Sequence, residues 1–515
     1  TVEDSTTVGV RLYFVDYSTT FRNLTITNSG DPGQGAHEAG LAIRSSFFAP
    51  VFEGLEISGS VGPAVSSTSG GAMQGNDWYL HNNSKQGLYV DSSTLILDDL
   101  HLSDNGYSGV HVFDARYVSL SNITSLGNGV SGVLDSEKAG IYFDKSNDLE
   151  SNSGDVTCNF CTVKQSLGAG ILVKDSVDLW LNHITLEDNN PSYAPLSIDN
   201  GGLTLGQQGG RLHLHDIQID TERTGSQTGP AMELNKAAAY IDLVTMSGNH
   251  SGIVWNADNN GNFISSMSRV QFSGSSCLVL SDHIELSGQD NTITPLCTGS
   301  LIFQNSNVNW SGLVDLTTNT ALNLDSFSSL HLHQPSQVDL NNAIIGLSAT
   351  IDVAWDIEVW AINNNSNGIP QAIIDLTFDQ FESSAQEPTN EIGYVKFPNY
   401  VGQQWTQSGA SSTTSATISC GYDGISNSSS VLLDQDRVVY CLLPLGNQAP
   451  FLIWDTPEDL EIFPSGSIVE FNASDSWDLD NDPLTWEWTS SIDGIIGTDS
   501  NFTVNDLSSS QSLSD

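Results

Sequence analysis

The chain has 515 residues, and only 15% of them are charged. Its 61 acidic residues far outnumber its 15 Lys and Arg residues, which gives a formal net charge of -46. Phosphate binding needs clustered Lys and Arg side chains, so this balance excludes nucleic acid as a partner and disfavours an anionic membrane surface. A polyanionic polysaccharide is disfavoured on the same ground, unless cations bridge it. The length predicts several domains, or one long solenoid with additions.

Much of the chain repeats a short apolar phrase, most regularly between residues 87 and 175. Successive copies begin at glycines 22, 31 and 30 residues apart and end in aspartate: Gly87-Leu-Tyr-Val-Asp91, Gly109-Val-His-Val-Phe-Asp114, Gly140-Ile-Tyr-Phe-Asp144 and Gly170-Ile-Leu-Val-Lys-Asp175. Strict alternation of apolar residues over four or five positions predicts a strand rather than a helix. Recurrence at this period predicts a solenoid.

A second strand phrase separates these copies and is followed by a polar turn rich in Asn and Gly. Examples are Val118-Ser-Leu-Ser-Asn-Ile-Thr124 and Leu212-His-Leu-His-Asp-Ile-Gln-Ile219. No segment shows a sustained helical period, so we predict an all-β fold of stacked parallel strands. The pattern resembles the right-handed parallel β-helix family, the architecture of pectate lyases and many surface proteins, over roughly residues 10–345. We assign residues 1–347 to this β-helix.

After residue 349 the predicted strands become longer, as in Ile351-Asp-Val-Ala-Trp-Asp-Ile-Glu-Val-Trp-Ala-Ile362. The stretches Gly368-Ile-Pro-Gln-Ala-Ile-Ile-Asp-Leu-Thr-Phe378 and Thr389-Asn-Glu-Ile-Gly-Tyr-Val-Lys-Phe397 resemble the carboxypeptidase-regulatory and collagen-adhesin-B type of β-sandwich. We therefore predict an Ig-like sandwich over residues 348–446. The resemblance implies that Cys420 and Cys441 close its last strands.

A linker at Asn447-Gln-Ala-Pro450 precedes a last module, assigned to residues 447–515. Its stretch from Gly466 through Ser476-Trp-Asp-Leu-Asp-Asn-Asp-Pro-Leu-Thr-Trp-Glu-Trp488 is similar to polycystic-kidney-disease-type and cadherin-like Ig modules, except that Trp477 stands where a small residue is usual. We interpret the module as cut short, because the strands expected after Asn501-Phe-Thr-Val504 are absent.

The same module contains the clearest ion signal of the sequence. Asp478, Asp480 and Asp482 place carboxylates at alternate positions of a loop, and Asp475 is a further candidate ligand. Ca²⁺ prefers several oxygen ligands, so this loop predicts a Ca²⁺ site. The alternative is a solvated acidic turn. The sequence gives no sign of an organic cofactor.

Six cysteines fall as three local pairs, which predicts disulfides and an oxidising compartment: Cys158 with Cys161, Cys277 with Cys297, and Cys420 with Cys441. For Cys158-Asn-Phe-Cys161 a zinc half-site or a redox pair is the alternative. Frequent Asn-X-Ser/Thr sequons agree with export as a glycoprotein. The sequence has no signal peptide and no apolar run that could span a bilayer, so we interpret the chain as a fragment of a longer exported protein.

Equivalent positions in a parallel stack form columns, because neighbouring coils are roughly 4.8 Å apart. We expect Asp91, Asp114, Asp144 and Asp175 to form one such column. One interpretation is a ladder of turn residues, since Asp ends strands well. The other is a line of carboxylates that binds Ca²⁺ or acts in acid/base catalysis, which makes Asp114, Asp144 and Asp175 candidate catalytic residues.

A column of aromatic residues is expected beside these aspartates. If the apolar residues of each phrase point inward, Tyr89, His111 and Tyr142 point outward together. The basic residues Arg116, Lys145 and Lys174 flank the same turn, and Arg116 and Lys145 are further candidate catalytic residues. Trp180 is also expected to point outward. Such a surface is typical of a carbohydrate groove. The alternative is an ordinary cross-strand ladder that stabilises the sheet.

Two functions fit these features. The first is an exported, cell-surface protein of structural or adhesive type that binds carbohydrate or another cell-surface partner. The second is an extracellular polysaccharide lyase or glycoside hydrolase. The first is preferred, because the Gly-His-Gly phrase of polygalacturonases and the Asp-Pro-His-Asp phrase of mannuronan epimerases are missing. His213 and His215 could form a two-His metal site, although a solvated strand face is the simpler interpretation.

Overall fold

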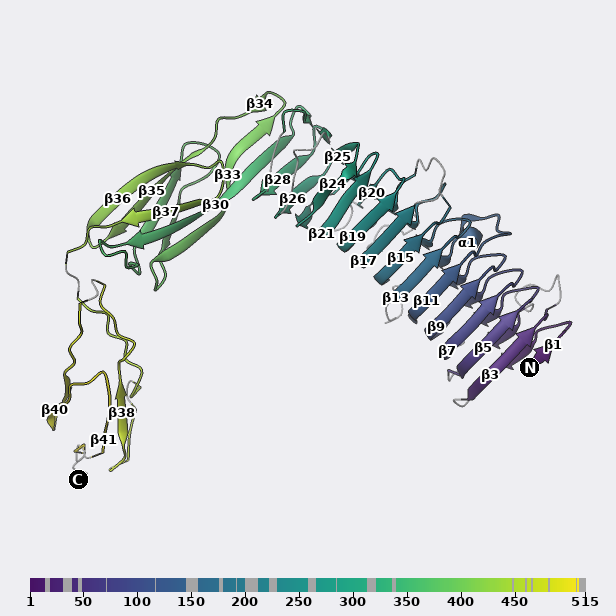
Figure 1. Cartoon of the computed structure of the whole chain (residues 1–515), viewed down its shortest axis with the longest axis horizontal. Helices are drawn as coiled ribbons and strands as arrows, with labels where there is room; N and C mark the ends of the chain where they lie inside the picture. Colours follow the sequence, from purple (N-terminus) through teal and green to yellow (C-terminus); the bar gives the residue numbers. More distant parts are fainter. Residues whose placement is uncertain are drawn as a thin grey trace. The chain divides into compact units, whose positions relative to one another are not determined.

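The computed structural model describes residues 1–13, 19–30, 39–44, 49–70, 72–115, 117–144, 156–175, 179–190, 192–199, 212–221, 229–257, 265–283, 285–312, 321–335, 340–446, 449–458, 461–464, 466–479, 482–505 and 507–508. Their regular secondary structure is almost all β-strand, with one short helix, α1 (Asp135–Lys138) (Figure 1). They form two compact units: Thr1–Val353 with Gln404–Ala410, and Ala354–Gln403 with Ser411–Asp515. The division into three domains at residues 347 and 446 stays a prediction.

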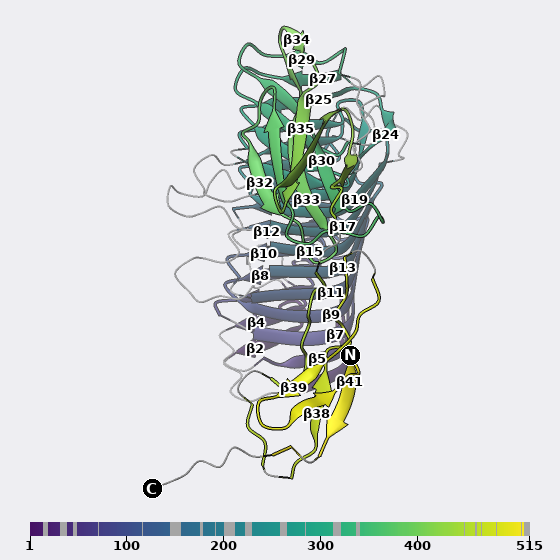
Figure 2. The same cartoon turned by 90° about the vertical axis from the view of Figure 1, so that its left-hand side faces the viewer.

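The first unit contains a parallel sheet of 14 short strands, hereafter the short-strand sheet (Figure 2). Each strand follows the apolar phrase of one coil. The strands are β2 (Val10–Tyr13), β4 (Leu41–Arg44), β6 (Val65–Thr68), β8 (Leu88–Asp91), β10 (Val110–Phe113), β12 (Ile141–Asp144), β14 (Ile171–Lys174), β16 (Leu196–Asp199), β18 (Met232–Asn235), β20 (Ile253–Asn256), β22 (Leu278–Ser281), β25 (Ser300–Gln304), β27 (Ala321–Leu324) and β29 (Ile344–Ile345).

Longer strands alternate with these along the chain and pair in parallel with one another, forming the long-strand sheet. They are β1 (Val2–Glu3), β3 (Thr20–Thr27), β5 (Val51–Ser58), β7 (Ala72–His81), β9 (Thr94–Ser103), β11 (Tyr117–Leu126), β13 (Val156–Lys164), β15 (Leu179–Glu187), β17 (Leu212–Thr221), β19 (Ala239–Gly248), β21 (Ser265–Gly274), β23 (Leu286–Gln289), β24 (Thr292–Cys297), β26 (Asn307–Ser311) and β28 (Ser329–His333). Two parallel sheets that alternate in this way form a right-handed parallel β-helix, which confirms the predicted fold class.

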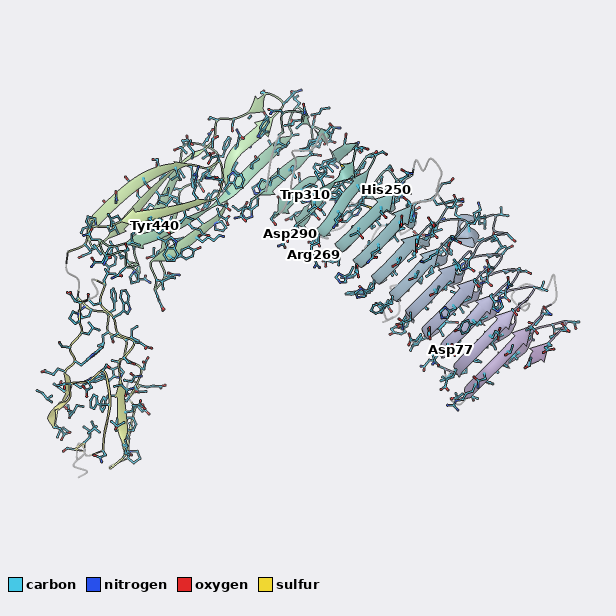
Figure 3. The ribbon with its side chains drawn as sticks, viewed as in Figure 1. Asp77, His250, Arg269, Asp290, Trp310 and Tyr440 are labelled. Atoms are coloured by element: carbon cyan, nitrogen blue, oxygen red, sulfur yellow. A yellow bond between two sulfur atoms is a disulfide. The ribbon has the colours of Figure 1, made fainter. Side chains whose placement is uncertain are left out.

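The core of the β-helix lies between the sheets. Alternate residues point inward, so that Leu88 and Val90 of β8 are fully buried and lie in register with Val110 and Val112 of β10. Large aromatic side chains fill the later coils, where Trp310 packs against Phe272 and Phe303. Figure 3 labels Trp310 among these coils. Trp255 is fully buried as well.

A ladder of buried asparagines aligns the early coils at the turn after each long strand. The side-chain amide of Asn83 donates to Asn105 Oδ1 at 2.9 Å, and that of Asn105 donates to Asn128 Oδ1 at 2.9 Å. Each amide also donates to a backbone carbonyl, as Asn105 does to Leu80. The ladder satisfies polar groups that would otherwise be unpaired inside the turn, and so it fixes the register of successive coils.

Glycines precede several short strands because neighbouring coils approach closely there. A Cβ atom added at Gly140 would lie 2.8 Å from the carbonyl oxygen of Gly170 and 2.5 Å from Ser166 Oγ. Gly109 stands in the same relation to Gly140, whose carbonyl oxygen would lie 2.7 Å from an added Cβ. The recurring glycine of the repeat is therefore a packing requirement.

The second unit contains a β-sandwich. One layer includes β30 (Thr350–Ile362), β33 (Tyr394–Thr406) and β37 (Arg437–Leu442). The short strand β34 (Gly409–Ala410), which pairs with the end of β33, belongs to the first unit. The other layer is an antiparallel sheet of β31 (Ile373–Phe378), β32 (Ala385–Pro388), β35 (Ser415–Tyr422) and β36 (Ile425–Leu432). Apolar side chains such as Val359, Ile374 and Ile418 fill the space between the layers.

Four short strands follow the sandwich in the chain. They form two antiparallel pairs, β38 (Val469–Asn472) with β41 (Asn501–Val504) and β39 (Trp488–Ser490) with β40 (Gly494–Gly497). Phe471, Trp488 and Phe502 pack together as their core.

Candidate functional site

The aromatic column is present on the outward side of the short-strand sheet. His111 of β10 lies in register with Tyr89 of β8 and Tyr142 of β12. The ring centroid of His111 is 5.2 Å from that of Tyr89 and 4.8 Å from that of Tyr142, in edge-to-face contacts. The alternation of the repeat therefore brought these three residues together as predicted.

The expectation that this column is exposed is wrong for Tyr142, which is only 4% exposed. The connection after β11 contains α1 and packs, with Ala139, against Tyr142 and Leu172 on the outward side of the sheet. Burial also lowers the pKa of His111 to about 4, and its Nδ1 has no hydrogen-bond partner among the described residues. Burial raises the pKa of Tyr142, and its hydroxyl donates to Asp144 Oδ2 at 2.7 Å. The middle of the column thus contributes to packing.

The predicted single column of aspartates is also wrong. Asp91 and Asp144 are each in register with Phe113, and Asp144 is also in register with Lys174. Asp114 and Asp175 lie one position further on, in the turn, with φ of 48° and 51°. The reason is the spacing from the repeat glycine: Asp91 and Asp144 each stand four positions after their glycine, whereas Asp114 and Asp175 each stand five positions after theirs. At this position of successive strands Phe113 separates Asp91 from Asp144, and Lys174 follows Asp144, so these carboxylates are not stacked on adjacent strands.

Trp180 does not join this column, because it belongs to β15 of the long-strand sheet. Its ring stacks face to face on His213 at 3.5 Å, and His213 stacks on Tyr240 at 5.1 Å. Stacking occupies the ring faces that a sugar would contact. His213 and His215 lie on the outward side of β17, alternating with the buried residues Leu212 and Leu214, and His215 Nδ1 lies 3.0 Å from Asp242 Oδ2. The hydrogen bond from Arg269 lowers the pKa of Asp242.

A hollow of about 300 Å³ opens further along the outward side of the short-strand sheet. Lys174 of β14, Asp199 of β16 and Glu233 of β18 contribute charged side chains to it. Tyr193 and Asp135 line it from the connections that precede β16 and form α1. The hollow therefore combines hydrogen-bond donors and acceptors with an aromatic ring.

Hydrogen bonds hold the walls of this hollow in place. The Tyr193 hydroxyl donates to Asp135 Oδ1 at 2.9 Å and accepts from Lys138 Nζ at 3.2 Å. The Lys138 ammonium also lies 5.8 Å from the Tyr193 ring centroid. In the floor, Asn235 Nδ2 donates to Asp199 Oδ1 at 2.9 Å. Contacts between α1 and Tyr193 thus link two distant coils at the site.

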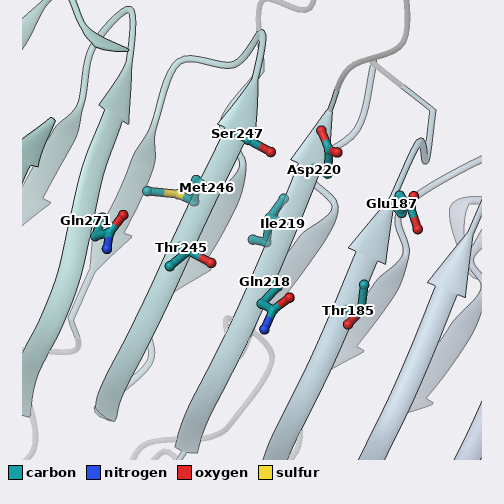
Figure 4. Close-up of a pocket in the computed structure, with 9 residues that line it drawn as sticks. All are labelled: Thr185, Glu187, Gln218, Ile219, Asp220, Thr245, Met246, Ser247 and Gln271. Carbon is teal, nitrogen blue, oxygen red and sulfur yellow. The ribbon is translucent and has the colours of Figure 1, made fainter. Parts of the chain in front are cut away.

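A second, shallower hollow of about 460 Å³ lies on the long-strand sheet (Figure 4). Hydroxyl and amide side chains of Thr185, Gln218, Thr245 and Gln271 form one row across it, and Figure 4 shows them on successive strands. Its lining contains no aromatic ring. Its apolar contacts come only from the aliphatic side chains of Ile219 and Met246, so the hollow at Tyr193, which has an aromatic ring, is the stronger ligand site.

The predicted Ca²⁺ ligands stay a prediction. Asp480 lies outside the described residues, and Asp478 is buried, with its Oδ1 accepting a hydrogen bond from the backbone N–H of Asp482 at 3.2 Å. Among the residues that the structure describes, no three His, Cys, Asp or Glu side chains, Asp475 included, are placed to hold a metal ion. Trp477, the departure from the family pattern, stacks on Phe451 at 4.7 Å.

The three predicted disulfides are present: Cys158–Cys161, Cys277–Cys297 and Cys420–Cys441. They exclude the alternative of a zinc half-site at Cys158. Two other candidates, Arg116 and Lys145, lie outside the described residues. In the part of the chain that the structure describes, no helix is both long and apolar enough to cross a membrane.

The sequence-based expectations missed Asp199, Glu233 and Tyr193. The first lies in Pro195-Leu-Ser-Ile-Asp199, a copy of the apolar phrase with proline in place of glycine. Glu233 occupies the outward position of Ala231-Met-Glu-Leu-Asn235, so alternation alone could have identified it. Tyr193 comes from a connection, and no periodic signal marks it.

Comparisons with known proteins agree with this architecture and leave the chemistry open. No curated protein and no solved structure gives a significant match to the chain. Residues 8–216, which include the aromatic column and the first part of the hollow, match the family model described as the right handed beta helix region.

Proposed function

We propose that the chain is an extracellular, cell-surface β-helix protein that binds carbohydrate in the hollow at Lys174, Asp199, Glu233 and Tyr193. The observation that carries the proposal is the meeting of charged hydrogen-bonding groups and an anchored tyrosine on the outward side of the short-strand sheet. Sugar hydroxyls pair with such groups, and the apolar faces of sugar rings contact aromatic rings. Three disulfides support an oxidising compartment.

The negative charge of the hollow and of the chain limits the class of saccharide that can bind. Asp135, Asp199 and Glu233 outnumber Lys174 in the hollow, and the chain as a whole carries a formal net charge of -46. A polyanionic sugar would be repelled by this surface. Neutral or amino-bearing saccharides are therefore the ligands that we propose.

We expect the Glu233→Gln variant to bind its saccharide at least about ten-fold more weakly than the unchanged chain, because it removes a charged acceptor without changing the shape of the side chain. Affinity would be measured by calorimetry, after a screen of neutral and amino-bearing saccharides. Glu56→Gln is the matched control, since Glu56 is an exposed residue on β5 of the long-strand sheet. Equal losses in both variants, or no binding by the unchanged chain, would contradict the proposal.

An extracellular glycoside hydrolase is the second candidate, and the placement of two carboxylates favours it. Asp199 is in register with Asn235, two positions after Glu233 on the neighbouring strand. Strand spacing and rise place the two Cα atoms roughly 8 Å apart. Both side chains line the hollow, and an inverting glycosidase needs its two carboxyl groups about 6.5–9.5 Å apart, with room for a water molecule between them.

If the hollow is catalytic, the chain releases reducing ends from a polysaccharide, and both Asp199→Asn and Glu233→Gln lower that rate by at least about 10³-fold. A colorimetric reducing-end assay across the saccharides of the binding screen would measure this, with Glu56→Gln as the control. If the unchanged chain binds a saccharide but does not hydrolyse it, the hydrolase proposal is wrong and the proposal of a binding protein stands.

A further inference from the structure

The outward side of the β30–β37 layer of the sandwich is apolar where a soluble sandwich is normally polar. Along β37 the inward residues Val439 and Cys441 are buried in the core, whereas Val438, Tyr440 and Leu442 point outward. These three side chains are 55%, 65% and 44% exposed. An apolar residue at every outward position of a strand breaks the pattern that keeps sheet surfaces soluble, and such breaks mark interaction sites.

The outward side of the other sandwich sheet has the polar residues that are usual on a sheet surface facing solvent. There β36 exposes Ser426, Ser428 and Ser430, and the Ser430 and Thr417 hydroxyls are 3.1 Å apart. The two layers share one core and one disulfide, Cys420–Cys441. On the sheet of β31 and β36, Leu432 and Ile373 are 52% and 40% exposed, but neither strand has apolar residues at successive outward positions, so the continuous apolar run is a feature of the β30–β37 layer.

Aromatic residues on that layer form a row across the strands. Tyr440 of β37 is in register with Trp360 of β30. On the other side, the Trp360 ring lies 4.8 Å from the Tyr394 ring of β33, with an angle of 50° between the two planes. Figure 3 shows Tyr440 on the strands of the sandwich. Unlike the face-to-face stack of the long-strand sheet, the tilted rings of this row keep part of their faces available to a ligand.

The charges around the row are already paired with one another. Lys396 Nζ lies 2.6 Å from Asp356 Oδ2 and 3.8 Å from Glu358 Oε1, and Arg437 pairs with Asp434. An ionic ligand would have to displace one of these pairs. An uncharged ligand with flat apolar faces fits the row without that cost.

We propose that the row of Tyr394, Trp360 and Tyr440 is a second carbohydrate-binding site, which takes a linear, uncharged polysaccharide lying across β33, β30 and β37. The rings contact the apolar faces of successive sugar residues, and the paired side chains at the rim offer hydrogen bonds to hydroxyl groups. This site lies on the second unit and does not depend on the hollow of the β-helix.

The test is affinity electrophoresis of the full chain through gels that contain neutral soluble polysaccharides, with pull-down on insoluble cellulose and chitin. We expect at least one of them to retard the unchanged chain, and we expect Tyr440→Ala and Trp360→Ala each to lose at least about ten-fold of that affinity. Tyr79→Ala is the matched control, because Tyr79 is comparably exposed but lies on the β-helix. It should bind like the unchanged chain.

Failure of this site and failure of the hollow are distinguishable. If Glu233→Gln abolishes the retardation and Tyr440→Ala does not change it, the polysaccharide binds in the hollow. That result would overturn the second site. Absence of retardation by every neutral polysaccharide would overturn it too. If Tyr440→Ala instead changes the sedimentation of the chain, the row is a protein contact and the carbohydrate proposal is wrong.

Discussion

Acidification from about pH 7 to about pH 5 is expected to lower the free energy of unfolding by about 2 kcal/mol through His283 alone. His283 is 1% exposed, and its ring packs edge-to-face on Trp255. Its Nε2 hydrogen bonds to the Trp255 carbonyl at 3.3 Å, while its Nδ1 has no partner among the described residues. Burial lowers the pKa of His283 to about 4.

The direction of this change in the free energy of unfolding follows from proton uptake by the unfolded chain. The unfolded chain binds a proton at His283 below about pH 6.5, whereas the folded chain does so only near pH 4. The stabilising effect of the neutral ring is therefore complete above about pH 6.5 and is lost as the pH falls towards 4. His111, whose pKa is lowered to the same value, adds to this loss.

Urea midpoints at the two pH values would measure the effect in the unchanged chain and in His283→Gln. The variant should lose about 2 kcal/mol less than the unchanged chain over this range. His101→Gln is the control, since the side chain of His101 is 40% exposed. A His283→Gln variant as sensitive to acid as the unchanged chain would show that the His283 ring is protonated inside the fold.

The Gly140→Ala variant is expected to lose roughly 2–3 kcal/mol of stability. The added methyl group would lie 2.8 Å from the Gly170 carbonyl oxygen, which belongs to the backbone of the next coil and cannot rotate away. Relief requires the two coils to separate, and the Ile141–Ile171 pair of β12 and β14 begins there. The loss would be measured from urea unfolding.

Gly229→Ala is the matched control for this substitution. An added Cβ at Gly229 would meet no atom within 4 Å, so the variant should unfold within about 0.5 kcal/mol of the unchanged chain. Equal stability of the two variants would mean that the coils at Gly140 have room to adjust.

The β-helix could be predicted from the sequence because its strands combine strict alternation with a repeated step. The repeat also placed Tyr89, His111 and Tyr142 in register, since equal distances from the preceding glycine fix equal positions. The aspartate column failed for the same reason: its members stand at unequal distances from their glycines. The register of a residue in a solenoid depends on its number of positions from the start of the strand. Two residues of the same type at the ends of two strands are therefore not always in register.

The candidate site was less predictable because connections build part of it. The burial of Tyr142 depends on how the segment containing α1 packs on the sheet, and that segment has no periodic pattern. Tyr193 reaches the hollow from another connection and is fixed there by Asp135, 58 residues earlier in the chain. Contacts of this range follow from the path of the connections, which local residue patterns do not specify.

The shared register of the coils makes one coil a unit of insertion and deletion. Residues 87–108 begin at one repeat glycine and stop just before the next, and β8 and β10 match residue for residue. If this coil were removed, Gly109 would stand where Gly87 stands, and Asn128 would take the place of Asn105 beside Asn83 in the buried ladder. The β-helix can therefore lengthen or shorten in evolution by whole coils while the hollow around Asp199 and Glu233 keeps its composition.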